Sequence, residues 1–556
     1  MKHLLLISLI FLSLTANAST KYHEQAIASA HPAATQAGLA VLNQGGNAFD
    51  AAVAISAALA VVEPFGSGMG GGGFWLLHRQ SDGMQVMLDG REVAPLAAHR
   101  DMYLDQQGEP VKSASVNGAL AAGIPGLPAA LVQLSKKYGQ LPLLDSLKPA
   151  IRLAKQGFLV NEHYRRLAKF RHAVLASNKS ASTIFLVDGK VPELGALIKQ
   201  MDLADTLQLL AEHGFDGFYK GDLASKLVRG VQLNGGIWSM QDLANYTVKE
   251  RAPVVIDYKN IKVTSAALPS SGGLVLAITL NILEQYDLSA MDETTRVHVV
   301  VEAMRRAYRD RVLYMGDSDF VEVPVVELSK KSYAREASTN LSLDKATPSQ
   351  QLTGLNQIEG HDTTHFSVID KDGNRVAATL SINYPFGSGF VPSGTGVLLN
   401  DEMDDFSIKP GTPNVYGLVG GEANAIKAGK RMLSSMSPTF IETDNKVGVL
   451  GTPGGSRIIS MVLLAILDAE KGQSSESWVN LPRYHHQYLP DAIQHEPDTF
   501  KDEVALGLKQ KGHTLKSVGR HYGNMHAILW DKKNNKLMAA SDRRGSGSAI
   551  VEQVTQ

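Results

Sequence analysis

Residues 362–383, DTTHFSVIDKDGNRVAATLSIN, hold the side chains in this sequence that are best placed to do chemistry. A threonine hydroxyl is a weak nucleophile unless a base lies beside it. Cleavage of the chain before Thr363 would give that residue a free α-amino group, which can serve as the base for its own hydroxyl. The pKa of such an amine, roughly 7.7–8.0 in model compounds, leaves a neutral fraction near pH 7. The alternative interpretation is that two threonines at a strand start reflect β propensity alone.

The hairpin that follows Thr363 predicts which residues lie near it. Residues 371–373, Lys-Asp-Gly, suit a three-residue loop in which Gly373 adopts a positive φ. With that loop, Thr363 faces Ser381 on one side of the sheet, and Asn383 lies one step diagonal. A two-residue loop would shift the register by one and turn Ser381 to the opposite face. A site at Thr363 therefore requires the longer, bulged turn.

The composition narrows the class of protein. The chain has 556 residues, of which 44% are hydrophobic and 20% charged, and its formal net charge is −1. These values are ordinary for a globular protein with a large core, and the length allows several domains. The absence of a basic excess argues against a nucleic-acid partner. The sequence contains no cysteine, which excludes disulfides, thiolate metal sites and a cysteine nucleophile.

The first residues predict an export signal. Lys2 and His3 precede an apolar run from Leu4 to Leu14, and residues 16–18, Ala-Asn-Ala, fit a signal-peptidase site. The run is too short to be a finished membrane anchor. We therefore expect residues 1–18 to be removed and the mature protein to be soluble and exported, periplasmic or secreted. The alternative is an uncleaved anchor.

The segments before residue 100 predict a tightly packed frame. Asn47 suits the N-cap of an alanine-rich helix, which follows a helix that stops at Gly45-Gly46. Residues 66–73 are glycine-rich and contain a formal G-x-G-x-x-G match. Their order is helix, glycines, strand, whereas a dinucleotide site needs strand, glycines, helix. We interpret the run as a tight loop where backbones meet. Arg91, at the end of the next strand, is either a carboxylate clamp or a surface residue.

The middle of the chain predicts mostly helices. Residues 126–250 have helical patterns, and residues 292–315 predict an amphipathic helix. We expect its arginines to form a solvated or ion-paired face; they are Arg305, Arg306, Arg309 and Arg311. Residues 329–360 are polar and loop-like, which is where a processing segment should lie.

Three patterns after Thr363 suggest binding groups. The acids between residues 399 and 406 suggest a cation or an ammonium group as partner, or else a capped helix start. Residues 432–438 place hydroxyls in an extended stretch. The glycine-rich residues 451–457 enter a helix over 458–470, and N–H groups at such an entry suit an oxyanion. His485 and His486 would point to opposite faces of one strand, which argues against a metal site.

Together these motifs resemble the gamma-glutamyltranspeptidases, a family of N-terminal-nucleophile hydrolases, over nearly the whole mature chain. The motifs that carry the resemblance are GGNAFDAAVA at 45–54, SGMGGGGF at 67–74, GREVAP at 90–95, PSSGG at 269–273, EAMRRAYRDR at 302–311, TTHFSVID at 363–370, NDEMDDFS at 400–407, LSSMSPT at 433–439, GTPGGSRI at 451–458 and PRYHHQYLPD at 482–491.

The resemblance implies a role for each matching residue. Thr363 would be the nucleophile both for cleavage after Asp362 and for catalysis, with Ser381 as a second hydroxyl bonded to it. The remaining implied roles are Asn383, Glu402 and Asp405 for the substrate's α-ammonium, Arg91, Ser434 and Ser435 for its α-carboxylate, Gly454 and Gly455 for the oxyanion hole, and Tyr416, in a lid over residues 413–416, for contact with Asn383.

The resemblance also implies an α+β fold, a four-layer αββα sandwich built from two chains of one precursor. Residues 19–362 would form the large subunit and residues 363–556 the small catalytic subunit. The expected activity is transfer of the gamma-glutamyl group of glutathione and related amides to water, amino acids or peptides. No metal, organic cofactor or stable membrane anchor is expected.

Two departures from the family pattern, Asp362 and residues 384–386, Tyr-Pro-Phe, could alter the cleavage rate or the shape of the pocket. Two alternatives keep the fold and change the substrate: a β-lactam side-chain acylase and a capsule poly-γ-glutamate enzyme. A third, from another class, is an exported binding protein with an inactive site.

Overall fold

Two β-sheets packed face to face form the centre of the protein, in a computed structural model that describes residues 24–351, 363–412, 414, 418 and 420–554. The first sheet has the spatial order β18 (Ser548–Gln553), β1 (Glu24–Ser29), β9 (Thr364–Ile369), β10 (Arg375–Ser381), β2 (Gly72–Arg79), β3 (Met84–Gly90) and β6 (Lys249–Arg251). The second has the order β17 (Lys536–Ser541), β16 (His526–Asp531), β12 (Lys446–Gly451), β11 (Thr439–Glu442), β8 (Ile261–Ser265) and β7 (Val254–Tyr258).

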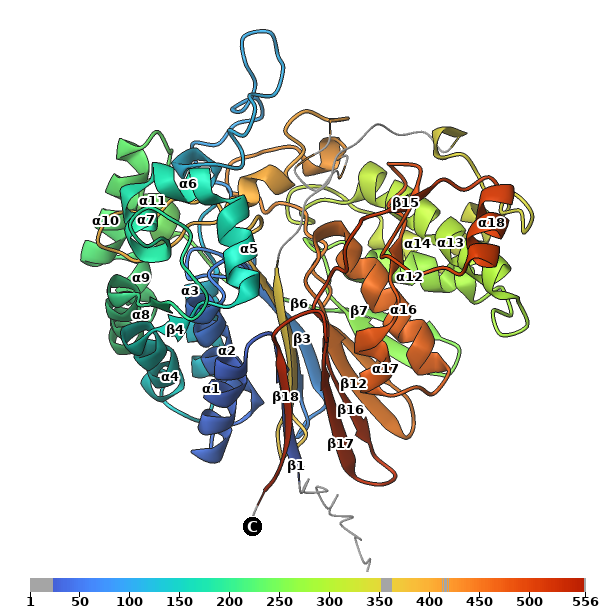
Figure 1. Cartoon of the computed structure of the whole chain (residues 1–556), viewed down its shortest axis with the longest axis horizontal. Coiled ribbons are helices and arrows are strands. Elements are labelled where there is room, and N and C mark those ends of the chain that lie inside the picture. Colours follow the sequence, from blue (N-terminus) through green and yellow to red (C-terminus); the bar gives the residue numbers. More distant parts are fainter. Residues whose placement is uncertain (1–23, 352–362, 413, 415–417, 419, 555–556) are drawn as a thin grey trace, which may run out of the picture.

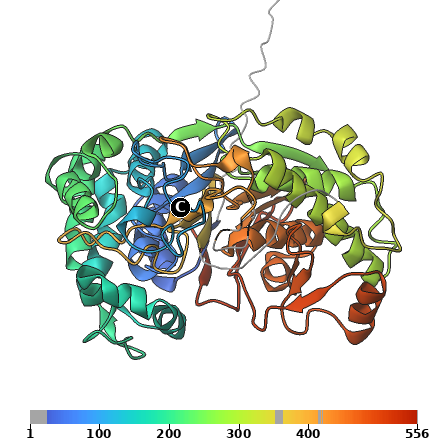
Figure 2. The same cartoon turned by 90° about the horizontal axis from the view of Figure 1, so that it is seen from above.

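Helices cover the outer face of each sheet, as Figures 1 and 2 show from two directions. The layer against the first sheet contains α1 (Pro32–Asn43), α2 (Ala48–Val62), α3 (Leu127–Tyr138), α4 (Leu143–Gln156) and α8 (Met201–His213). The layer against the second contains α12 (Gly272–Leu283), α13 (Glu293–Tyr314), α16 (Ile458–Glu470) and α17 (Ser475–Asn480). The predicted αββα sandwich is therefore confirmed.

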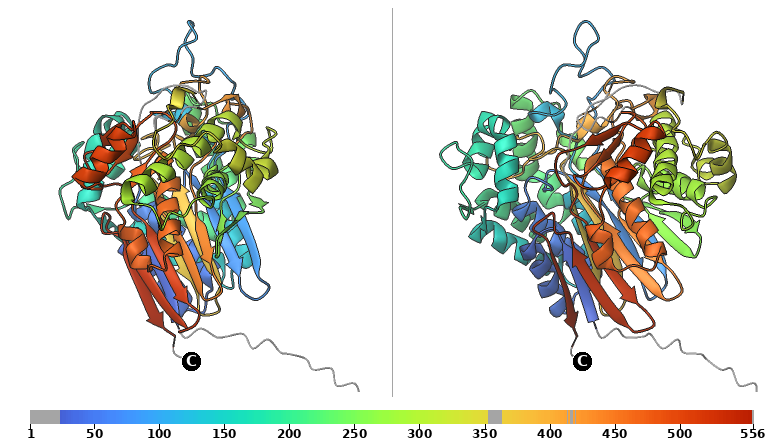
Figure 3. Two further views of the ribbon diagram at one scale, coloured as in Figure 1. Left: turned by 90° about the vertical axis from the view of Figure 1, so that its right-hand side faces the viewer. Right: turned by 45° about the vertical axis from the view of Figure 1, so that its right-hand side comes forward.

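The remaining α-helices and strands surround these layers (Figure 3). They are α5 (Glu162–Phe170), α6 (His172–Ser177), α7 (Lys179–Phe185), α9 (Phe215–Tyr219), α10 (Gly221–Leu233), α11 (Met240–Ala244), α14 (Val325–Leu328), α15 (Lys331–Ala337), α18 (Asp502–Gln510), and the strands β4 (Phe158–Leu159), β5 (Leu197–Ile198), β13 (Tyr484–His485), β14 (Ile493–His495) and β15 (Leu515–Ser517). The predicted helical region over 126–250 is confirmed by α3 to α11.

The β9–β10 hairpin has the predicted register. Gly373 has a φ of 82° and closes the three-residue loop. The ladder then runs to the pair of Thr364 with Leu380, one step short of Thr363 and Ser381. The conformation of the turn therefore sets the strand register that places Thr363, the candidate nucleophile, directly before a central strand.

The structure also confirms two predictions for the segments before residue 100, the helix N-cap at Asn47 and the close backbone approach at the glycine-rich residues 66–73. Asn47 accepts hydrogen bonds from two N–H groups of α2 in a capping box with Asp50, and every residue of α2 is buried. At Gly70 an added Cβ would lie 2.1 Å from the Leu398 carbonyl oxygen. The glycine run is therefore a place where two backbone segments touch, as predicted.

Two predictions about the middle of the chain were wrong. Helix α13 is not amphipathic in its burial, because both Arg305 and Arg306 lie inside the protein along with the apolar side chains beside them. The ion-paired alternative for these two arginines is confirmed, since each forms a salt bridge with Glu302. The polar segment after residue 329 is not all loop, because it contains α15.

Within the part of the chain that the structure describes, no helix has both the length and the apolar composition needed to cross a bilayer. The predicted signal peptide, residues 1–18, lies outside the described residues, as do Asp362 and Tyr416.

Candidate active site

Thr363 immediately precedes β9 and lines a pocket formed by segments that are far apart in the sequence. Eight of the predicted site residues meet there: Arg91, Thr363, Ser381, Asn383, Asp405, Ser434, Ser435 and Gly455. Glu402 and Gly454 do not line the pocket itself; each adjoins a residue that does. The structure thus brings together hydroxyls, an amide, a guanidinium and a carboxylate around one threonine.

The turn after β10 places an amide beside a hydroxyl. Asn383 has a left-handed φ of 73°, and its backbone N–H donates to Ser381 Oγ at 2.7 Å. Its side-chain nitrogen donates to the Asp401 carbonyl oxygen at 3.0 Å. These bonds fix the side of the pocket that is formed by β10.

Arg91 is the centre of a buried ion cluster. Its side chain is 1% exposed, and its two terminal nitrogens contact Glu402 Oε2 at 2.5 Å and Asp405 Oδ2 at 2.6 Å. Its Nε donates to the Met432 carbonyl oxygen at 3.3 Å. The residue predicted to bind a carboxylate and two residues predicted to bind an ammonium group are therefore partners of one another in this structure.

The cluster holds more carboxylates than cations. Glu92 lies 3.7 Å from the Arg91 guanidinium, so three acids surround one arginine. Burial raises the pKa of Glu402 to about 8, although Arg91 acts in the opposite direction. Burial also raises the pKa of Glu92 well above its usual range. The cluster therefore retains at least one proton near neutral pH.

Residues 434–436 are held by the segment PSSGG at 269–273. The Ser434 N–H donates to the Pro269 carbonyl oxygen, and the Ser271 N–H donates to the Ser434 carbonyl oxygen, both at 2.8 Å. Ser270 Oγ donates to the Met436 carbonyl oxygen at 2.6 Å. These bonds present the Ser434 and Ser435 side chains to the pocket.

Arg311 also lines the pocket, and sequence reasoning placed it on a helix face without a role in the site. Its Nη2 donates to Ser435 Oγ at 3.3 Å. Arg305 and Arg306 each have Glu302 three or four residues away on the helix, whereas neither Arg309 nor Arg311 has an acid at those spacings, so helical spacing alone does not single out Arg311.

The loop before α16 supplies backbone N–H groups. Gly454 and Gly455 have φ values of 143° and 56°, which favour glycine, and Gly455 borders the pocket. Ser456 Oγ donates to Gln487 Oε1 at 2.6 Å, and the Tyr308 hydroxyl donates to the Ser456 carbonyl oxygen at 2.5 Å. The loop is thus held rigidly where N–H groups can face an oxyanion.

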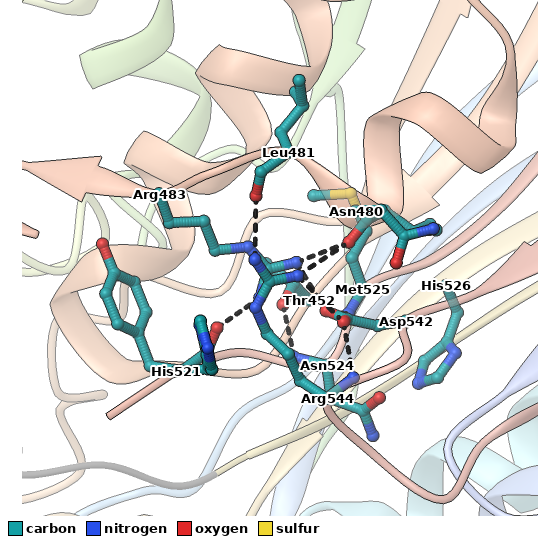
Figure 4. A network of polar contacts seen from close by, with 12 residues as sticks. Thr452, Asn480, Leu481, Arg483, His521, Asn524, Met525, His526, Asp542 and Arg544 are labelled. Atoms are coloured by element: carbon teal, nitrogen blue, oxygen red, sulfur yellow. Dashed lines mark hydrogen bonds and ion pairs between the residues drawn. The ribbon is translucent and has the colours of Figure 1, made fainter. Parts of the chain in front are cut away.

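A polar network anchors the start of this loop (Figure 4). Thr452 Oγ accepts a hydrogen bond from the Asn524 N–H at 3.2 Å. Next to it, Asp542 accepts from the Met525 N–H at 3.0 Å and pairs with Arg483 at 2.5 Å. Arg483 belongs to the motif at 482–491, so this motif helps to hold the loop at residues 451–457 in place through Asp542 and the segment that contacts Thr452.

The two adjacent histidines of that motif are buried and used in hydrogen bonds. His485 contacts Ser460 Oγ at 2.6 Å and Gln487 Oε1 at 2.8 Å. His486 Nδ1 accepts from the Tyr488 N–H at 3.2 Å. Burial lowers the pKa of both histidines. They therefore belong to the structural support of the site.

Among the described residues, one group of side chains has ligand atoms close enough together to hold a metal ion. It consists of His298, Glu302 and His513. Glu302 already pairs with Arg305 and Arg306, so a metal ion there would lie beside two guanidinium groups. This arrangement does not fit a cation site.

Comparison with known proteins identifies relatives of the whole chain. The family model described as Gamma-glutamyltranspeptidase matches residues 34–552. The glutathione hydrolase proenzyme of Escherichia coli (strain K12) is 44% identical over 525 residues, which is 93% of this chain and 90% of that protein. Cephalosporin acylase from Bacillus halodurans matches with a TM-score of 0.83 at 27% identity, covering 95% and 96% of the two chains. Helicobacter pylori gamma-glutamyltranspeptidase matches with a TM-score of 0.57 at 42% identity, covering 58% and 94%.

Proposed function

The chain belongs to the gamma-glutamyltranspeptidase family, and from that premise we propose that Thr363 is the nucleophile of this enzyme, created by cleavage after Asp362. The protein is a self-processing gamma-glutamyltransferase and glutathione hydrolase, made as one precursor that is divided into subunits. The observation that supports the role of Thr363 is its position in one pocket with Gly455, Arg91 and Asp405.

The chemistry follows from these positions. The Thr363 hydroxyl attacks the γ-carbonyl carbon of the substrate, and the Thr363 α-amine accepts the hydroxyl proton. The N–H groups of Gly454 and Gly455 stabilise the negative charge on the carbonyl oxygen. The amine leaving group departs with the proton, and a threonyl ester remains. Water or an acceptor amine then attacks this ester and releases the glutamyl group.

Charge complementarity in the pocket supports a free glutamyl end as substrate. In the proposed complex the substrate's α-ammonium contacts Asn383, Glu402 and Asp405, while its α-carboxylate contacts Arg91 and the two serines Ser434 and Ser435. The buried pairs of Arg91 with Glu402 and Asp405 would be exchanged for pairs with a zwitterion, so the pocket keeps its charge balance. These charges favour a glutamyl group over the apolar acyl group of an acylase substrate.

The subunit limits and the route to the cell envelope are part of the same proposal. Residues 1–18 would be removed on export to the periplasm or outside the cell. Residues 19–362 would become the large subunit and residues 363–556 the small one. Tyr416 would lie over the pocket as a lid, and amino acids or peptides would act as acceptors.

Turnover of γ-glutamyl p-nitroanilide by the purified protein tests this function, with and without a dipeptide acceptor. The wild-type enzyme should release nitroaniline, and the acceptor should give a γ-glutamyl dipeptide. Thr363→Ser keeps a hydroxyl and an amine and should retain measurable activity, whereas Thr363→Ala should have none. Activity in the alanine variant would refute the role of Thr363.

A further inference from the structure

A cavity of about 190 Å³ lies between the start of α13, the end of α16 and the segments around residues 481–484 and 499–500. Figure 1 shows α13 and α16 in the same outer layer of helices. Among the described residues, none lines both this cavity and the pocket of Thr363. The cavity is therefore separate from the candidate active site.

The interior of the cavity is apolar. Four buried aliphatic side chains line it: Val297, Val300, Leu464 and Leu467. The rings of Tyr484 and Phe500, whose centroids are 5.6 Å apart, also line it. An apolar cavity of about 150 Å³ is large enough to bind benzene. This cavity therefore has room for an apolar side chain the size of an aromatic ring.

Five charged side chains also line the cavity, and they are Glu293, Arg296, Asp468, Glu470 and Lys471. Glu470 already forms an ion pair with Lys259 at 3.0 Å. Within the described part of the chain, none of the other four has an oppositely charged group within 4.0 Å. These four are two acids and two cations, so their charges cancel. A ligand that carries both signs of charge suits them better than a simple anion or cation.

The acid and the cation from α13 lie beside a tyrosine hydroxyl. Glu293 and Arg296 are three residues apart, so they share one face of the helix. Burial raises the pKa of Tyr484, Arg296 acts in the opposite direction, and Glu293 raises the pKa further, so both charges act on this hydroxyl. The described residues offer the Tyr484 hydroxyl no hydrogen-bond partner within 3.5 Å. Three polar groups are thus available to a ligand at this place.

The acid and the cation from the end of α16 are less available. Asp468 Oδ2 accepts a hydrogen bond from Ser477 Oγ at 2.6 Å. Lys471 is exposed, so its ammonium group is solvated. The charged end of a ligand is therefore expected at α13.

We propose that this cavity is a second binding site of the protein, for a free α-amino acid with an apolar or aromatic side chain. The side chain of the ligand occupies the cavity. Its α-carboxylate pairs with Arg296 and accepts a hydrogen bond from the Tyr484 hydroxyl, and its α-ammonium pairs with Glu293. A guanidinium group suits this role because its planar fork matches a carboxylate. The site goes beyond the proposed function, which uses only the pocket of Thr363, and does not depend on it.

Three probes that share one fluorinated ring test the charge requirement. They are 4-fluoro-L-phenylalanine, 3-(4-fluorophenyl)propanoate, which lacks the ammonium group, and 2-(4-fluorophenyl)ethylamine, which lacks the carboxylate. Each is titrated with the purified wild-type protein by fluorine NMR, without any γ-glutamyl donor, so that no probe is consumed.

The amino-acid probe should bind about 10-fold or more tightly than either of the others, because each of these lacks one charged hydrogen-bonding group. A probe with a single charge that binds as tightly as the amino acid would overturn the inference. So would the absence of binding of the amino-acid probe at concentrations up to about 10 mM.

Two variants locate the bound probe. Arg296→Gln should weaken binding of the amino acid and of the propanoate about 10-fold, whereas Glu293→Gln should weaken binding of the amino acid and leave the propanoate unchanged. Neither change threatens the fold, since Glu293 is exposed and Arg296 is half-buried. Arg335→Gln is the matched control, because it removes an exposed arginine that lines neither the cavity nor the pocket, and it should bind all three probes as the wild type does. Wild-type affinity for the amino acid in Arg296→Gln would show that the probe binds elsewhere and would overturn the inference.

Discussion

Replacement of Arg91 by methionine removes the guanidinium that contacts both Glu402 and Asp405 in the acid cluster of the pocket. The variant is best made in the Thr363→Ala background, which should remain one chain and so have one unfolding reaction. Methionine fills much of the volume of the arginine stem but leaves Glu402 and Asp405 without their 2.5 Å and 2.6 Å contacts.

The size of the effect follows from these two contacts. Loss of one charge-assisted hydrogen bond costs about 1.5–3 kcal/mol, and removal of one partner from a buried ion pair costs about 3–5 kcal/mol. We therefore expect the free energy of unfolding to fall by about 3–5 kcal/mol at pH 8.

The loss should depend on pH. The pKa of Glu402 is already about 8 in the folded protein, above its ordinary value of 4.5, and loss of Arg91 removes a group that lowers it. A carboxyl group whose pKa is raised by folding contributes its stability below the unfolded pKa and loses it as the pH rises through the folded pKa. The Arg91→Met variant should therefore be less destabilised at pH 5, where Glu402 is protonated, than at pH 8.

Urea unfolding followed by tryptophan fluorescence at pH 5 and pH 8 measures both quantities. Arg79→Met is the matched control, because Arg79 forms an ion pair with Asp82 on the surface, where side-chain exposures are 38% and 50%. Such a pair contributes about 1 kcal/mol or less. A loss below about 1 kcal/mol for Arg91→Met at pH 8, or a larger loss at pH 5 than at pH 8, would refute this account of the cluster.

Two further changes are predicted in the same background and by the same unfolding measurement. Burial raises the pKa of Glu63 from 4.5 to about 7, so the protein with Glu63 loses free energy of unfolding as the pH rises through 7. Glu63→Gln should be more stable than its parent by about 3 kcal/mol at pH 8 and similar to it below pH 4.5. An equal difference at both pH values would contradict this prediction. Gly70→Ala should lower the free energy of unfolding by about 1–3 kcal/mol, because the new Cβ would lie 2.1 Å from the Leu398 carbonyl oxygen. The control Gly66→Ala, whose Cβ would lie 3.5 Å from the nearest atom, should be tolerated. Equal effects of the two substitutions would show that the loop can relax.

The sequence was sufficient where structure is decided locally. The 371–373 loop set the register of the hairpin, and the register set the place of Ser381, because a three-residue loop with a positive φ at Gly373 permits one pairing. The cap at Asn47 and the close approach at the glycine run followed in the same way from the conformational limits of single residues.

The sequence was insufficient where the outcome depends on which distant segments meet. It gave the charges of Arg91 and Glu402 but not their pairing, since these residues are more than 300 positions apart and become partners only when the two segments fold together. The burial of α13 was missed for the same reason. Helical periodicity shows which residues share a face, but other segments decide whether that face is covered. Arg311 was therefore expected on a solvated or ion-paired face and lies in the pocket.

The central claim is that Thr363 cleaves the chain and then catalyses the reaction. The measurement that tests it most directly is the N-terminal sequence of each chain in the purified protein, made in parallel for the wild type and for Thr363→Ala. The wild type should give a small chain that begins TTHFSVID, and the alanine variant should remain one chain. A small chain that begins at another residue, or an alanine variant that is cut at the same bond, would contradict the claim.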